Sequence, residues 1–191
     1  LDTSRHTALE LTTLRNTWLG ESTLTLDHWV GRQEGRPCIA KFEARASLLE
    51  RNLDKGVELM GELLYDTRLT GPQAEAAFEQ VLGQFKLNFE QDFIQSGHNY
   101  AILRASRSFS TDAALGERTG GVSMYRYLCG LLEKKDWAAL SARLEAVRDK
   151  LLHHCALTVT CHGSEAVCSR LQELLPASAF AAEGRMPARP Y

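Results

Sequence analysis

The spacing of apolar residues predicts several amphipathic helices. Leu49, Leu53, Val57, Met60 and Leu64 recur at helical spacing, which is typical of a helix with one buried stripe. Further stripes of this kind follow Gly121 and Asp136. The most aromatic stripe consists of Ala74, Phe78, Val81, Phe85, Phe89 and Phe93. We predict that these phenylalanines pack in the core and do not bind a cofactor.

Alternation of apolar and polar residues predicts three strands. The first two cover residues 24–30 and 38–44, and the loop between them is bounded by Gly31 and Gly35, with Pro37 before the second strand. This arrangement is typical of a β-hairpin. The third predicted strand runs from Cys155 to Cys161. Strands and helices do not alternate strictly, so we predict an α+β fold in which an antiparallel sheet packs against several long helices.

Three strands offer too little surface for so many helices, and we therefore expect the sheet to lack upstream strands. We predict one α+β domain over residues 1–175 and a loose tail over residues 176–191, which is rich in Ala, Pro and Arg. Thr7-x-x-Glu10 and Ser47-x-x-Glu50 have the capping-box pattern, so each predicts the start of a helix. We expect residues 110–121 to form a loop or a short turn.

Composition excludes several classes of protein. The net charge is −2, from 22 basic and 24 acidic residues, and without a basic run the sequence does not suggest nucleic-acid binding. No apolar run reaches membrane-spanning length, and no signal peptide is visible. The five cysteines are irregularly spaced, which favours reduced thiols over a disulfide framework. We expect a cytoplasmic, bacterial location, with an organelle matrix as the alternative.

Two groups of residues could bind a metal or an anion. His153, His154, Cys155, Cys161 and His162 are close in sequence. Neighbours on a strand point to opposite faces, so few of these side chains converge, and we expect no metal site here. A Cys–His nucleophile pair is equally unsupported by the spacing. Gly120-Gly121 precedes a helix whose N-terminus could hold an anion, but close backbone packing is the favoured interpretation.

The segment around residues 96–104 has two possible interpretations. Ser96-Gly97 interrupts a long predicted helix, and one turn of helix separates Tyr100 from Arg104. His98, Tyr100 and Arg104 could line a peptide-binding wall or an inter-domain contact. In the structural alternative, which we favour, Ser96-Gly97 forms a kink, His98 and Arg104 bind nearby carbonyl groups, and Tyr100 packs between helices.

Three strings of sequence carry a family resemblance. They are LLERNLDKGVELMGELLY (residues 48–65), SGHNYAILRA (residues 96–105) and GGVS (residues 120–123). Together they resemble the C-terminal half of presequence-protease-like zinc metallopeptidases, which belong to the pitrilysin and insulinase group of inverted zincins.

The resemblance implies a fold and a role. Such enzymes are clam-shells of two halves, each made of two α+β domains, around a chamber in which unfolded peptides are cut. Their zinc motif, His-x-x-Glu-His, lies in the first domain, and this chain resembles the third. The motif does not occur here: the nearest string, His162-Gly163-Ser164-Glu165-Ala166, has Ala in place of the second ligand. We therefore expect neither zinc binding nor peptide cleavage by this chain alone.

The expected role is architectural, with the remaining domains of a parent peptidase as partners. Zinc and unfolded peptides would then be bound by the parent protein, and the fragment could self-associate through exposed strand edges. An alternative is a free-standing, non-catalytic binding subunit that pairs with a separate peptidase subunit. A third, less favoured, is an unrelated hydrolase that uses Cys and His.

Overall fold

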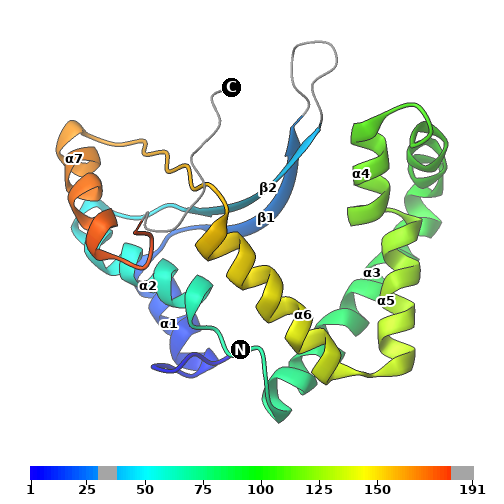
Figure 1. Cartoon of the computed structure of the whole chain (residues 1–191), viewed down its shortest axis with the longest axis horizontal. Coiled ribbons are helices and arrows are strands. Elements are labelled where there is room, and N and C mark those ends of the chain that lie inside the picture. The colour runs from blue at the N-terminus through cyan, green and yellow to red at the C-terminus, as the bar shows by residue number, and fades with distance from the viewer. Residues whose placement is uncertain (30–37, 182–191) are drawn as a thin grey trace. The chain divides into compact units, whose positions relative to one another are not determined.

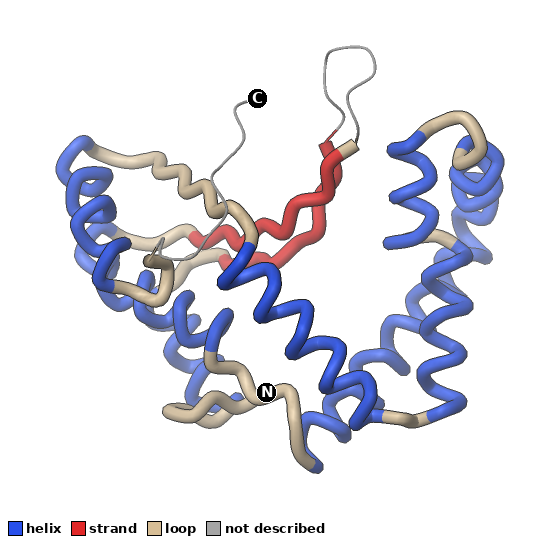
Figure 2. Tube along the Cα trace, viewed as in Figure 1, coloured by secondary structure: helices blue, strands red, loops and turns tan. Residues whose placement is uncertain are grey.

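The computed structural model describes residues 1–29 and 38–181. In this part of the chain, seven α-helices accompany a two-stranded antiparallel sheet (Figures 1 and 2), and the prediction of an α+β fold is confirmed. The described residues fall into two compact units. The first comprises Leu1–Leu24, Ala44–Gly71 and the chain from Ala139 onward, and the second comprises Thr25–Glu43 and Pro72–Ala138. The expected domain boundary at residue 175 stays a prediction.

The predicted hairpin is present. β1 covers Ser22–Trp29 and β2 covers Ile39–Ala46, and the two strands pair with each other. The predicted loop with Gly31 and Gly35, together with Val30 and Pro37, lies outside the described residues. Most side chains of both strands are exposed, among them Leu24, Leu26 and Ile39. The hairpin therefore leaves much of its apolar surface uncovered.

The third predicted strand is wrong. Residues 155–164, between α6 and α7, form a loop in the structure (Figure 2), and the described sheet contains β1 and β2 alone. Leu157 and Val159 alternate as a strand would require, yet both are exposed. Alternation favours an extended backbone, but a strand also needs a neighbour that accepts and donates its backbone hydrogen bonds. No described segment provides that neighbour.

In the first unit, α1 (Ala8–Trp18) and α2 (Leu53–Tyr65) enclose a small core of Leu11, Leu19 and Leu59. α7 (Glu165–Leu174) and the 3-10 turn Leu175–Ala177 belong to the same unit. Trp137–Asp149 forms α6, which ends in the π-helical turn Lys150–His154. Residues 182–191, most of the predicted tail, lie outside the described residues.

The two predicted capping boxes have different outcomes. The side chains and backbones of Thr7 and Glu10 cap α1 reciprocally, as predicted. Ser47 caps no helix: its Oγ accepts a hydrogen bond at 2.8 Å from the backbone N–H of Glu21. The 3-10 turn Glu50–Asn52 precedes α2, and neither has a side-chain cap. The hydrogen bond of Ser47 connects the residue before β1 with the residue after β2.

The second unit is built on α3 (Pro72–Ser106), which packs against α4 (Thr111–Gly120) and α5 (Val122–Lys134). The predicted interruption of the long helix is confirmed, because Ser96 has a non-helical backbone (φ −134°, ψ 26°) within α3. The predicted loop over residues 110–121 is wrong. The hydroxyl of Ser110 accepts a hydrogen bond from the N–H of Ala113 and starts α4, which buries Ala113 and Glu117.

The phenylalanine stripe of α3 is only partly buried, contrary to prediction. Ala74 and Phe78 are buried, and the Phe78 ring lies 6.4 Å from that of Trp137. Val81 and Phe85 are 51% and 52% exposed. α3 has 35 residues, whereas α4 and α5 have 10 and 13, so these partners are too short to cover the whole stripe. None of the helices in the described part of the chain combines the length and apolarity that a membrane span requires.

Candidate functional site

A buried carboxylate holds α3, α4 and α5 together. Glu117, on α4, is 1% exposed. Its Oε1 accepts a hydrogen bond at 2.8 Å from Nη1 of Arg104, on α3. The same oxygen accepts bonds from the backbone N–H of Ser123 at 3.2 Å and from its hydroxyl at 2.9 Å, both at the start of α5. Arg104 is thus an internal partner of Glu117, and it binds a side-chain carboxylate and not the backbone carbonyl group of the structural interpretation.

The same contacts explain why glycine is needed at one position of Gly120-Gly121. The helix N-terminus that follows these glycines does hold an anion, and that anion is the chain's own Glu117 carboxylate. A Cβ on Gly121 would lie 2.8 Å from both Cα and the backbone oxygen of Glu117, closer than atoms can approach. A Cβ on Gly120 would meet no atom of the described residues within 4 Å. Only the second glycine is therefore required by close packing.

Tyr100 belongs to an aromatic cluster. Its ring lies edge-on to Phe93 at 4.7 Å and 6.3 Å from Phe89, both on the preceding part of α3. Tyr125, on α5, packs against the same two phenylalanines at 5.1 and 6.2 Å. The Tyr100 hydroxyl donates to Asp92 at 3.4 Å, and burial together with that carboxylate raises its pKa. The cluster packs the two parts of the kinked helix against each other.

The other predicted residues of this segment lie apart from the Glu117 contacts. His98 is exposed, and Gly97 has open space where a Cβ would lie. The kink is thus located at Ser96. A Cβ at position 97 would meet no neighbouring atom of the described residues, so close packing does not require glycine there. Of the three candidate residues, Tyr100 and Arg104 make inward contacts, whereas His98 faces solvent.

The His and Cys residues between 153 and 162 make separate contacts. The His153 ring lies 5.4 Å from that of Tyr65, and His154 Nε2 is 3.4 Å from an Asp149 carboxylate oxygen. A hydrogen bond with Cys168 raises the pKa of the Cys161 thiol. Within residues 1–29 and 38–181, no trio drawn from this group gathers its potential ligand atoms.

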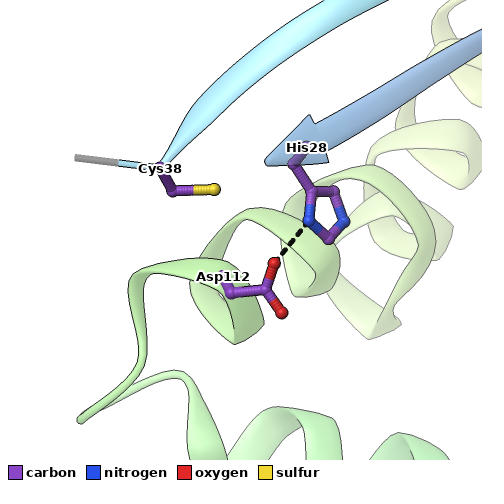
Figure 3. Close-up of side chains that lie close together, drawn as sticks. All are labelled: His28, Cys38 and Asp112. Carbon is purple, nitrogen blue, oxygen red and sulfur yellow. Dashed lines mark hydrogen bonds and ion pairs between the residues drawn. The ribbon is translucent and has the colours of Figure 1, made fainter. Parts of the chain in front are cut away.

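A different trio does converge, and the sequence did not reveal it. His28 near the end of β1, Cys38 just before β2 and Asp112 in the first turn of α4 place one potential ligand atom each within 4.8 Å of one another. His28 Nδ1 and Asp112 Oδ1 are 2.6 Å apart (Figure 3). All three residues are half-buried. His28 and Cys38 occupy facing ends of a predicted hairpin, and the sequence could have indicated from this that they lie close together. Nothing in the sequence placed Asp112 beside them.

The first unit contains an open cleft of about 460 Å³ that α2 and the residues after α7 line. Four of its lining residues are acidic: Asp54, Glu58, Glu62 and Asp66. Most of this charge is internally balanced. Glu62 accepts from Arg5 at 3.3 Å and lies 2.8 Å from His6 Nδ1, while Arg170 donates to Asp54 at 2.7 Å. These contacts tie neighbouring segments to α2 and do not identify a ligand.

Comparison with known proteins agrees with the resemblance seen in the sequence. The family model for the region associated with peptidase family M-16, subfamily C, matches residues 1–131. This range contains all three strings that carried the resemblance. The mitochondrial presequence protease of Danio rerio is 25% identical over an alignment of 149 residues that covers 76% of this chain. The chain spans 14% of the length of that relative. Because the family model matches more than half of the sequence, this chain belongs to the peptidase-associated family that the model describes.

Proposed function

We propose that this chain is a non-catalytic structural segment of a larger zinc metallopeptidase that degrades unfolded peptides. In this role it forms part of the chamber wall and contacts the other domains of its parent. Family membership and the 14% coverage of a presequence protease support the proposal. The absence of His-x-x-Glu-His from the 191 residues supports assignment of the catalytic zinc to another part of the parent.

The hairpin is the structural observation that carries the proposal. β1 and β2 pair only with each other among the described residues, so each strand has one unpaired edge. Leu24 and Leu26 on β1 and Ile39 and Phe42 on β2 are all exposed. An exposed apolar hairpin of this kind is a template for further strands. In the proposed parent, strands from preceding residues cover it.

The exposed part of α3 supports the same role. Val81 and Phe85 are one turn apart on one face of the helix. We propose that another domain of the parent covers this face. His98, which is exposed, is the residue of the predicted trio that we assign to contacts with substrate or with another domain. Tyr100 and Arg104 contact Asp92 and Glu117 instead.

The first test is the mass of the native polypeptide, measured by immunoblot with an antibody to this segment. A band several times larger than 21.3 kDa supports the proposal. A band near 21.3 kDa overturns it and favours the alternative, a free-standing subunit that pairs with a separate peptidase. The same blot on cell fractions tests the proposed location in a reducing compartment, cytoplasm or organelle matrix.

The second test is peptide cleavage. The purified chain is incubated with an unfolded peptide and zinc, and the products are analysed by mass spectrometry. We expect no cleavage, because the metal-bound water and the general base of an inverted zincin both require the missing motif. Zinc-dependent cleavage contradicts the proposal. Cleavage that thiol alkylation abolishes supports the third interpretation, a hydrolase that uses Cys and His.

A further inference from the structure

We propose that His28, Cys38 and Asp112 bind one divalent transition-metal ion, for which Zn²⁺ is the best chemical match. The sequence alone led to the expectation of no metal in this chain, and the geometry leads to a different conclusion. Imidazole nitrogen, thiolate sulfur and carboxylate oxygen are the three side-chain ligand types of zinc sites. The thiolate and the carboxylate together carry two negative charges, which balance the ion.

The distances fit an ion of this size. Tetrahedral zinc with bond lengths of about 2.0–2.3 Å separates its ligand atoms by about 3.3–3.8 Å. The three potential ligand atoms already lie within 4.8 Å of one another, and His28 Nδ1 is 2.6 Å from Asp112 Oδ1. Small side-chain rotations would separate His28 from Asp112 and bring the Cys38 sulfur closer to both. His28 and Asp112 side chains are 30% and 46% exposed, which leaves solvent access for the ion.

The orientation of the imidazole favours a metal site over a catalytic triad. In a Cys–His–Asp triad, the carboxylate binds one ring nitrogen and the thiol faces the other. Here the Cys38 sulfur and the Asp112 carboxylate lie on the same side of the ring, the side of Nδ1 (Figure 3). The Nε2 edge faces α4, where a Cβ on Gly116 would lie 3.9 Å from Nε2. The three donor atoms therefore surround a common point.

Binding changes the protonation of two side chains. In the metal-free state a proton lies between Nδ1 of His28 and the Asp112 carboxylate. Zinc at Nδ1 requires the neutral tautomer with hydrogen on Nε2, and the Cys38 thiol loses its proton to solvent. The hydrogen that Nδ1 shared with Asp112 moves to Nε2 by exchange with solvent, and the ion takes its place. Three residues and a water molecule then bind the ion. Because the ligands come from β1, from the residue just before β2 and from α4, the ion would link the hairpin to that helix.

Cobalt(II) provides the direct test, because it occupies zinc sites and is coloured. The purified, reduced 191-residue chain is titrated with Co²⁺ and followed by absorption spectroscopy. We expect saturation at one equivalent, a sulfur-to-cobalt charge-transfer band and the intense visible bands of four-coordinate cobalt. One equivalent of Zn²⁺ then abolishes these bands. If the chain shows no charge-transfer band at saturating Co²⁺, the proposal is wrong.

Matched variants locate the ion. Cys38→Ser should abolish the charge-transfer band, and Asp112→Asn should weaken Co²⁺ binding at least tenfold. Cys155→Ser is the control, because Cys155 is a half-buried thiol outside the trio, and its band should equal that of the wild type. An undiminished band in Cys38→Ser would assign the ion to other thiols, such as Cys161 and Cys168, and overturn the proposal. A wild-type chain without the band refutes the proposal even if a variant fails to fold.

Discussion

Arg104 Nη1 donates a hydrogen bond to Oε1 of Glu117 at 2.8 Å, and this pair joins α3 to α4 beneath the surface of the second unit. Glu117 is almost wholly buried, whereas the Arg104 side chain is 36% exposed. A buried carboxylate is costly without a partner. The arginine that could have been a substrate ligand therefore has a structural partner that accounts for its position.

Loss of this pair should destabilise the second unit. Arg104→Ala leaves Glu117 with Ser123 and a more distant Arg107, 4.0 Å away. We expect a loss of about 1–3 kcal/mol in the free energy of unfolding, because one charged partner of a buried group is removed. Urea unfolding followed by circular dichroism measures it. The control is Arg118→Ala, at an exposed position of α4, which should change stability little.

The two adjacent glycines should respond oppositely to alanine. In Gly121→Ala the new Cβ overlaps with Glu117, so we expect a loss of about 1–3 kcal/mol from overpacking. Gly120→Ala adds a Cβ in open space at the end of α4. It should be neutral or stabilise by up to about 1 kcal/mol, because alanine favours helix. Thermal unfolding of the two variants makes the comparison, and equal effects would contradict this packing.

The carboxylate of Glu90 should titrate at unusually low pH. The Tyr125 hydroxyl donates to Glu90 Oε1 at 2.8 Å. That bond is the main cause that lowers the pKa of Glu90 below its ordinary value of 4.5, and the nearby Lys86 lowers it by a smaller amount. Because the folded pKa is the lower one, the stabilisation is complete above pH 4.5 and is lost as pH falls through the folded pKa.

NMR titration of the Glu90 carboxyl carbon measures this shift. Tyr125→Phe removes the hydroxyl, so the titration midpoint should rise towards the ordinary value. Tyr127→Phe is the control, because Tyr127 is exposed on the same helix and should leave the midpoint unchanged. A midpoint that is the same in the wild type and in Tyr125→Phe would exclude Tyr125 as the main cause.

The uncovered hairpin should make the isolated chain self-associate. We expect dimers whose fraction rises with concentration in sedimentation velocity, since among the described residues each strand pairs with the other strand alone. Leu26→Lys places a charge on an exposed site of β1 and should shift the equilibrium towards monomer. Leu9→Lys, at a 78% exposed site on α1, is the matched control. A strictly monomeric wild-type chain at high concentration would refute this prediction.

The sequence by itself determined features that depend on neighbouring residues. It predicted the hairpin from alternation, the α1 cap from Thr7 and Glu10, and the break at Ser96 within a long helix. It also indicated the family through strings that all lie within residues 1–131. These features follow from local backbone hydrogen bonding and side-chain period, which are encoded within a few residues.

Only the tertiary structure decided which distant side chains meet. His28 and Asp112 are 84 positions apart, and Arg104 meets Glu117 because residues 111–120 form a helix where a loop was predicted. The segment over residues 155–161 has the local pattern of a strand but no described neighbour to pair with. Pairing, burial of charge and convergence of ligands depend on which surfaces the folded chain brings together, and periodicity alone does not encode them.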